Sequence, residues 1–308
     1  MEYLSANEIA LKWGISSTMV RRYCTRGQIP DAFVEYGIWK IPEDAKKPGN
    51  PVRAHTEESE TPPLLKKLLR QQHAYHSYIY DYLQINFSYS SSRMASNRLT
   101  RNHVEYLFKK SKLLFTNEDM KLNDFIEMRN HFLCLDYVIA NATKPLKSTF
   151  PLKLHSLLFS DVCGHKMAPI QSGVFRTGPA TLETGLKVPP ATISEKLTAM
   201  FKRYECIPNV TFQDILDLHV QFERIRPFDD GNGRIGRLLM LKECLRHDIT
   251  PIIIDDKHRA DYLDGIRLWN KDRSILAAVC VTAQARFQAQ MELGFLLEEQ
   301  VQMTKAQR

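Results

Sequence analysis

Apolar residues recur at intervals of three and four positions over most of the chain beyond residue 63, which predicts amphipathic helices and a mainly α fold. This spacing continues through an apolar run over 235–245. The other predicted helical segments are 64–69, 75–83, 104–108, 125–138, 152–158 and 212–222. Residues 172–190 interrupt the pattern with glycines and prolines, and the stretches 174–177 and 186–189 have the spacing of a short β-hairpin. We therefore expect a helical domain over 64–308 with one small hairpin.

The first 45 residues follow a different pattern. Ser5 and Glu8 have the spacing of a capping box, which starts a short helix that ends before Gly14. A second helix is expected over 17–25, and two short strands are expected over 33–41. The order helix, tight turn, helix and hairpin predicts a small winged helix-turn-helix module over residues 1–45. This order resembles the DNA-binding modules of the MerR and excisionase type.

Basic side chains gather on this module. Arg21, Arg22 and Arg26 belong to the second predicted helix, and Lys40 lies on the predicted wing. Such a helix fits the major groove of DNA, with Arg21 or Arg22 near the bases and Arg26 near phosphate. Helix-turn-helix units also dock proteins, and three arginines can form an ordinary solvated face. Of these two interpretations we favour DNA binding.

Residues 46–63 join the module to the helical part. They are rich in proline and charge and contain few apolar side chains, which is typical of a linker. The two parts should therefore fold separately.

Composition supports this division into one large and one small domain. The chain has 308 residues, of which 44% are hydrophobic, enough for a sizeable core. The net charge of +7 permits an anionic partner without requiring one. Six cysteines are scattered without a C-x-x-C pair, which argues against a zinc site or a disulfide framework. The chain has no apolar run of about 18 residues and no secretory pattern at its start, so we expect a cytoplasmic protein that does not contact a membrane.

The most informative segment is 226–237, which reads RPFDDGNGRIGR. Gly231, Asn232 and Gly233 stand just ahead of the apolar run over 235–245. A glycine-flanked turn that opens a helix leaves several backbone N–H groups unpaired and aimed at one point. Those groups and the positive end of the helix dipole favour a phosphate.

Three charged side chains strengthen this interpretation. Arg234 and Arg237 lie one helical turn apart, so both can converge on the same anion. Asp230 immediately precedes the turn, where its carboxylate can hold a Mg²⁺ that bridges phosphate oxygens. The segment therefore predicts a site for a polyphosphate with its metal.

The same segment resembles the core motif of the Fic family, H-P-F-x-[D/E]-G-N-G-R-x-x-R. Every specified position from Pro227 to Arg237 matches that pattern. Fic proteins typically transfer AMP from ATP to a Ser, Thr or Tyr hydroxyl of a target protein. The resemblance therefore implies ATP and Mg²⁺ as ligands and a protein as the acceptor.

The resemblance also implies a role for each matching residue. Asp230 would bind Mg²⁺, and Asn232 with the backbone of the turn would hold the α-phosphate. Arg234 and Arg237 would take the β- and γ-phosphates. Phe228 would anchor the loop in the core.

The first position of the motif departs from the family pattern. This chain has Arg226 where the family has the histidine that deprotonates the target hydroxyl. An arginine side chain, with a pKa above ~12, does not act as a base in proteins. Losing general-base catalysis lowers a rate by roughly 10²–10⁴-fold where chemistry is limiting. His219, about two helical turns or ~10 Å upstream, is one alternative base, although it also fits a helix residue that packs near the core.

A second departure concerns the inhibitory helix of many Fic proteins, whose glutamate pairs with the second arginine of the core motif. Residues 91–100 resemble that segment, with Ala95 at the position of the glutamate and Ser96 at that of the glycine. Alanine has no carboxylate, so Ala95 cannot clamp Arg237. An ordinary serine-capped helix is the alternative interpretation. Both departures fit a protein that has lost catalysis, and an engineered pair of substitutions would leave the same sequence.

The resemblance suggests how a target protein would dock. In the Fic family a β-hairpin flap lies over the site and binds the hydroxyl-bearing segment by strand addition. Residues 172–190 lie at a comparable place in this chain. The predicted fold is therefore mainly α: a Fic-type helical bundle with a short β-hairpin flap and a core at about 100–245, preceded by a small winged helix-turn-helix domain.

We expect a Fic-family protein that binds ATP or another nucleotide with Mg²⁺, transfers AMP weakly or not at all, and acts as a DNA-tethered regulator. The alternative is an active adenylyltransferase or phosphotransferase in which Arg226 stabilises charge instead of removing a proton. A third hypothesis is a scaffold whose pocket holds no nucleotide. The sequence leaves open whether the chain is an enzyme and whether it forms a homodimer.

Overall fold

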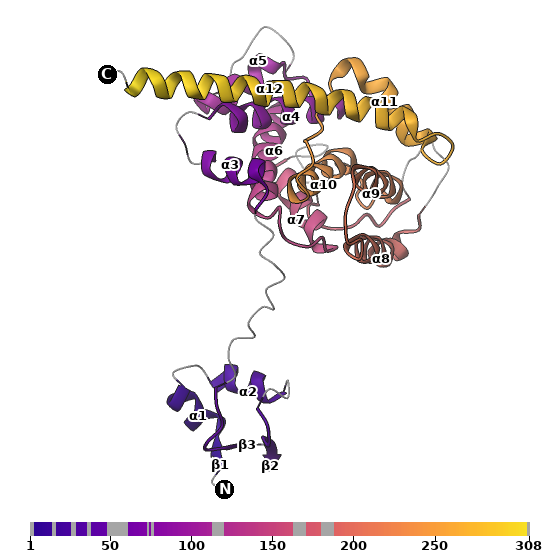
Figure 1. The fold of residues 1–308 in the computed structure, drawn as a ribbon. Helices are drawn as coiled ribbons and strands as arrows, with labels where there is room; N and C mark the ends of the chain where they lie inside the picture. Colours follow the sequence, from indigo (N-terminus) through magenta and orange to yellow (C-terminus); the bar gives the residue numbers. More distant parts are fainter. Residues whose placement is uncertain are drawn as a thin grey trace. The chain divides into compact units, whose positions relative to one another are not determined.

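The computed structural model divides into two compact units, Met1–Glu60 and Thr61–Arg308 (Figure 1). Each unit is described by itself. The residues that the structure describes are 3–13, 17–25, 29–35, 38–47, 61–72, 74, 77–112, 120–162, 171–179 and 188–306.

The first unit combines two short helices with a small antiparallel sheet. Its elements are β1 (Tyr3–Ser5), α1 (Ala6–Trp13), α2 (Ser17–Thr25), β2 (Phe33–Glu35) and β3 (Ile38–Pro42). The sheet has the order β1-β3-β2, and Tyr3 pairs with Pro42 while Phe33 pairs with Lys40. Both helices and the β2–β3 pair lie where the sequence predicts them.

Local hydrogen bonds explain where α1 begins. Ser5 N donates to Glu8 Oε2 at 2.8 Å and Glu8 N donates to Ser5 Oγ at 3.4 Å, which confirms the predicted capping box. The strand β1 was not predicted from the sequence. Its three residues are too few to show an alternating pattern, and they pair with a strand more than thirty residues away.

The second unit is helical, which confirms the predicted mainly α fold. Its elements are α3 (Pro63–Gln71), α4 (Tyr78–Met94), α5 (Arg101–Lys110), α6 (Leu122–Ala140), α7 (Thr149–Leu158), the 3-10 turn η2 (Pro190–Thr192), α8 (Ile193–Glu205), α9 (Phe212–Ile225), α10 (Asn232–Arg246), the 3-10 turn η3 (Asp256–His258), α11 (Arg259–Leu268) and α12 (Ser274–Ala306). Among the described residues, no helix combines the length and apolar composition that a membrane crossing requires.

The central element of this unit is α10, which packs against α9, α6, α4 and α7 (Figure 1). Ile235, Leu238 and Leu239 join the larger apolar cluster, whereas Met240 and Cys244 join a second one. Apolar and charged side chains of α10 alike are buried, so the helix lies inside the protein. The helix that begins at the glycine-flanked turn is therefore held on every side.

Two sequence-based expectations about local structure are corrected. The serines before Ala95 end α4 rather than starting a helix, and the next helix, α5, is capped by Thr100, whose Oγ1 accepts from His103 N at 3.3 Å. The stretch 174–177 is not a strand. Arg176 N donates instead to Pro227 O at 2.9 Å, so this stretch pairs with the chain that follows α9.

The predicted hairpin flap is described only in part. Residues 171–179 and 188–190 contain no strand, and residues 180–187 lie outside the described residues. The flap over 172–190 therefore stays a prediction.

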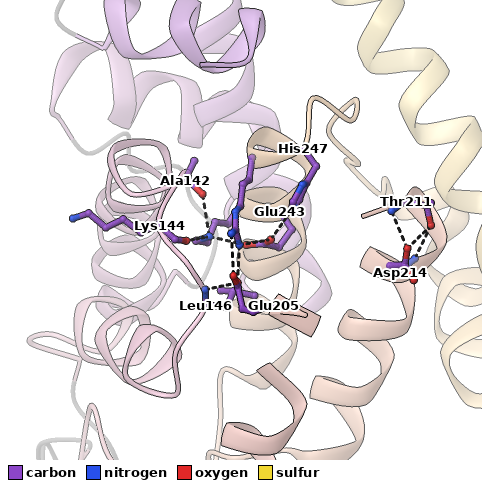
Figure 2. Close-up of polar contacts among 10 residues, drawn as sticks. Ala142, Lys144, Leu146, Glu205, Thr211, Asp214, Glu243 and His247 are labelled. Carbon is purple, nitrogen blue, oxygen red and sulfur yellow. Dashed lines mark hydrogen bonds and ion pairs between the residues drawn. The ribbon is translucent and has the colours of Figure 1, made fainter. Parts of the chain in front are cut away.

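A buried lysine, Lys242, holds the last turns of α10, and Figure 2 labels its partners Ala142, Lys144 and Glu243. Lys242 Nζ donates to the carbonyls of Ala142 at 3.0 Å and Lys144 at 2.6 Å, and to Glu243 Oε1 at 2.6 Å. Neither side chain of the Lys242–Glu243 pair has any exposed surface. A buried charge is tolerated only when its hydrogen bonds are complete, and this ammonium group uses all three of its protons. The network ties α10 to the loop that precedes α7.

We expect Lys242→Ala to lower the free energy of unfolding by about 3–5 kcal/mol, because it leaves a buried carboxylate and two carbonyls without their donor. Thr211→Ala provides the contrast, since Thr211 caps α9 at an exposed position in the same view (Figure 2). Losing that cap should lower the free energy by only about 1 kcal/mol. Urea unfolding of both variants measures the difference, and equal losses would contradict the role assigned to Lys242.

Two histidines tie helices together inside this unit. His131 Nδ1 on α6 lies 3.0 Å from Ser88 Oγ on α4, and His219 Nε2 on α9 lies 2.6 Å from Tyr262 OH on α11. Both rings are buried. Burial, reinforced by the charges of nearby arginines, lowers the pKa of each ring to about 3. Both histidines are therefore neutral in the folded protein.

This neutrality predicts acid destabilisation. Between an unfolded pKa of about 6.5 and a folded pKa of about 3, unfolding takes up one proton at each ring. The free energy of unfolding should therefore fall as pH falls, by about 1.4 kcal/mol per pH unit for each histidine. His131→Asn should remove one such proton, which denaturant unfolding at several pH values near 5 would detect. An unchanged slope would show that His131 is not held neutral.

Candidate functional site

The segment between α9 and α10 contains two residues with left-handed backbone. Arg226, the residue that follows α9, has φ 43° and ψ 70°, and its N donates to Phe222 O at 3.1 Å. Gly231, which precedes α10, has φ 78°. A Cβ at Gly231 would lie 2.6 Å from the ring of Phe159, so both the backbone angle and the space require glycine.

Asn232 braces the turn from inside. Its Oδ1 accepts from Phe228 N at 2.9 Å and its Nδ2 donates to Phe228 O at 2.7 Å, with only 2% of the residue exposed. The Asn232 amide is therefore occupied by the protein. The groups that remain for an anion are backbone N–H groups, because the first turn of a helix has no intrahelical acceptors for them.

Phe228 anchors the turn in the core. It is 1% exposed and stacks on His155 of α7 with ring centroids 4.1 Å apart. His155 Nδ1 accepts from Gly173 N at 2.8 Å, and burial lowers the pKa of His155 to about 4. The neutral imidazole thus links the turn to the chain at residue 173.

Arg234 points into the protein. Its guanidinium bonds to Glu127 of α6 and lies 3.3 Å from Asp230 Oδ2 and 5.0 Å from the ring of Phe159. Burial raises the pKa of Glu127, and the charge of Arg234 opposes that rise. Arg234 is 2% exposed, whereas the side chain of Asp230 is 72% exposed. Of this group, the Asp230 carboxylate is the part open to a ligand.

Arg237 contacts the end of α4. Its Nε donates to Ser91 Oγ at 3.0 Å and its Nη2 donates to Ser91 O at 2.8 Å. Its Nη1 lies close to Gly233, where an added Cβ would be 3.0 Å away. The guanidinium therefore lies against the first turn of α10. Ala95 follows the last turn of α4, and Ser91 contacts the arginine that the family's glutamate would clamp.

Arg226 is half-buried, and within the described ranges its guanidinium makes no hydrogen bond or ion pair. Burial raises the pKa of Glu223, and the positive charges of Arg237 and Arg226 oppose that rise. Glu223 Oε1 is buried and would lie 2.9 Å from a Cβ at Gly236, inside the contact between α9 and α10. This carboxylate does not reach the turn.

His219 does not reach the turn either. The ring is 1% exposed and its Nε2 pairs with Tyr262. Of the two interpretations of His219, the structure favours the packed core residue.

The structure places the predicted phosphate-site residues together. Asp230, Gly231, Asn232, Gly233, Arg234 and Arg237 all lie in the turn or in the first two turns of α10, with Arg226 just before them. A Mg²⁺ ion usually takes one or two carboxylates together with phosphate oxygens. The described residues contain no group of three or more histidine, cysteine, aspartate or glutamate side chains that could hold a metal ion.

The predicted DNA-binding residues are described only in part. Arg21 is exposed on α2, and Lys40 Nζ on β3 lies 3.7 Å from Glu35 Oε2. The side chain of Arg22 and the whole of Arg26 lie outside the described residues.

Four contributors to the site were not predicted from the sequence. Glu127, His155 and Arg176 lie on segments far from the motif, and no local pattern marks them. Ser91 lies in the segment that resembles the inhibitory helix, but the resemblance assigns a role only to the position of Ala95.

Comparisons with known proteins find similar sequences. The model of the Fic/DOC family matches residues 145–244. The protein adenylyltransferase Fic of Culex quinquefasciatus is 31% identical over 157 residues, which is 47% of this chain and 30% of that protein. The protein of the same name from Drosophila willistoni is 31% identical over 148 residues, 45% of this chain and 28% of that protein. The chain thus spans about three tenths of the length of these curated relatives.

Solved structures share the fold. A Fic domain containing signaling protein from Bacteroides thetaiotaomicron matches with a TM-score of 0.59 and 20% identity, covering 75% of this chain and 95% of that one. Fic-1 from C. elegans matches with a TM-score of 0.59 and 16% identity, covering 74% of this chain and 68% of that one. The chain therefore contains a Fic/DOC domain over residues 145–244, which include the turn before α10.

Proposed function

We propose that this Fic-family chain binds a nucleotide with Mg²⁺ and transfers AMP weakly or not at all. The observation that carries the proposal is Arg226, which stands at the family's histidine position directly before the turn. An arginine side chain cannot accept the proton of a target hydroxyl. His219, the alternative base, and Glu223 are both packed between helices.

Several features support phosphate binding at the turn. The backbone N–H groups of Gly233 and its neighbours open a buried helix, whose dipole favours an anion. Arg237 lies against Gly233 and adds a positive charge. In this proposal Asp230 holds Mg²⁺ on its exposed side, and Arg234, bound to Glu127, keeps the Asp230 carboxylate in place.

Arg226 adds a second role to the proposal. Its guanidinium makes no hydrogen bond within the described ranges, so it is available to an anionic group beside the turn. That charge would tighten the binding of a phosphate without supplying a base. The alternative function also requires an available guanidinium. In that function the chain is an active transferase, and Arg226 stabilises charge that develops during transfer.

Transfer assays with the native chain and Arg226→His separate these two functions. We expect ATP to bind the native chain in calorimetry while labelled AMP reaches neither the chain nor lysate proteins. Restoring a base with Arg226→His should raise transfer by roughly 10²–10⁴-fold. Strong transfer by the native chain, lowered by the same substitution, would instead establish the alternative.

Binding itself needs a matched control. Asp230→Ala should make ATP affinity independent of Mg²⁺, whereas Asp229→Ala, at the neighbouring exposed carboxylate, should preserve the dependence. Bound ligand identified by mass spectrometry distinguishes ATP from another phosphate compound. If no nucleotide binds or raises the melting temperature, the scaffold hypothesis holds.

For the first unit we propose DNA binding, which would make the protein a DNA-tethered regulator. Support comes from the exposed Arg21 on α2 and from Lys40 on β3, beside the β2–β3 pair that forms the predicted wing. Helices and wings of this type place basic residues along the phosphates of a duplex.

A mixed-sequence 30-bp duplex tests this proposal in fluorescence anisotropy at several salt concentrations. If Arg21 contacts a phosphate, Arg21→Ala should weaken binding and reduce the slope of log affinity against log salt by about one. Arg70→Ala, at an exposed arginine of the second unit, is the control and should change neither quantity. Equal binding by all three proteins would exclude a role for Arg21.

A further inference from the structure

Arg176 is a buried arginine whose side chain serves only backbone carbonyls. It is 3% exposed and lies outside any helix. Its Nε donates to Arg226 O at 2.7 Å, and its Nη2 donates to Val188 O at 2.6 Å and to Ile225 O at 3.4 Å. Its Nη1 donates to Gly178 O at 2.7 Å. No ion pair of Arg176 occurs in the part of the chain that the structure describes.

These contacts satisfy the end of α9. The last carbonyls of a helix have no intrahelical donors, and a guanidinium supplies several N–H groups in a fixed plane. Ile225 and Arg226 receive two of them, and the backbone N of Arg176 donates to the next carbonyl, that of Pro227, at 2.9 Å. One residue thus binds three consecutive carbonyls. A positive charge is also favoured at this end of a helix.

The bound carbonyls fix an unfavourable conformation. Arg226 has φ 43°, a value that residues with a Cβ rarely adopt. Its peptide oxygen is held by Nε of Arg176 on one side, while its own N bonds to Phe222 O on the other. The direction in which the side chain at 226 leaves the backbone is therefore set by neighbours that do not depend on what that side chain is.

The same guanidinium reaches the segment predicted to dock the target. Gly178 and Val188, whose carbonyls it binds, precede and follow residues 180–187 in the sequence. Residues 178 and 188 and residue 226 therefore share one rigid, planar group. A shift of either would break hydrogen bonds to the other.

We propose that Arg176 is a positioning residue, which fixes residue 226 relative to the phosphate-binding turn and to residues 178 and 188 of the predicted flap. This inference deepens the proposed function and rests on it, since position 226 is where a base would act. The phosphate-binding turn itself is held by Asn232 and Phe228. With histidine at position 226, Arg176 therefore governs the geometry of transfer and leaves the affinity for nucleotide unchanged.

A double-mutant cycle tests the hold on residue 226 without any activity. Glycine adopts a positive φ without strain, so Arg226→Gly removes the need for a clamp. Arg176→Lys keeps the charge but loses the planar fork. Losing the clamp lets a strained Arg226 relax but relieves nothing at a glycine, so Arg176→Lys should raise the unfolding equilibrium constant at least about two-fold less in the native chain than in the Arg226→Gly background.

A buried arginine elsewhere supplies the control for this cycle. Arg246 binds Glu205 with 21% of its side chain exposed, and it lies at the far end of α10 from the turn. Arg246→Lys should have the same effect with and without Arg226→Gly. If the effect of Arg176→Lys is also the same with and without Arg226→Gly, Arg176 does not hold residue 226 in its conformation and the proposal is overturned.

The functional arm uses the Arg226→His background. There Arg176→Lys should lower kcat for AMP transfer at least ten-fold, because a misplaced base loses the geometry of attack, while KM for ATP and calorimetric ATP affinity stay within about two-fold. A fall in ATP affinity equal to the fall in kcat/KM would refute the assignment. If Arg226→His shows no transfer, the proposed function is what fails, and the double-mutant cycle still decides the role of Arg176.

Discussion

The site depends on one constraint, which is that the N-terminus of a fully buried helix must present its free N–H groups at a fixed place. The apolar faces of α10 hold the helix body, and Lys242 secures its far end. At the near end, the Asn232 amide pairs with both polar backbone groups of Phe228. Gly231 allows the chain to turn against the ring of Phe159. The binding groups of the turn are thus backbone atoms, whose positions are set by packing.

The arginines around the turn have different hydrogen-bond partners. Among the described residues, Arg234 pairs with carboxylates, Arg237 bonds to a serine, and Arg176 bonds to backbone carbonyl oxygens. Arg226 is the exception, because its guanidinium makes no hydrogen bond within the described ranges. A free positive charge at the place where catalysis would need a proton acceptor favours binding over chemistry. This contrast between Arg226 and its neighbours is the physical basis of the proposed function.

The sequence predicted the helices well and the partners of the site poorly. Apolar periodicity marks long helices such as α6 and α9 because their burial repeats with the helical period. The motif marks the turn because its backbone angles and close approaches restrict which residues fit. Glu127 and Arg176 escaped prediction because their roles come from contacts between segments distant in the chain. The strand assigned to 174–177 was wrong because its backbone partner is Pro227, which no local pattern could indicate.

The contact between Arg237 and Ser91 has a quantitative consequence for ligand affinity. In the structure this guanidinium already has a hydroxyl and a carbonyl as acceptors, so a phosphate that recruits it must first draw it from α4. The apparent dissociation constant then equals the intrinsic one divided by the fraction of molecules in which Arg237 is not bonded to Ser91. The affinity for the proposed nucleotide would in this way be coupled to the end of α4, which need not touch the nucleotide, and mutations in α4 would tune that affinity without altering the turn.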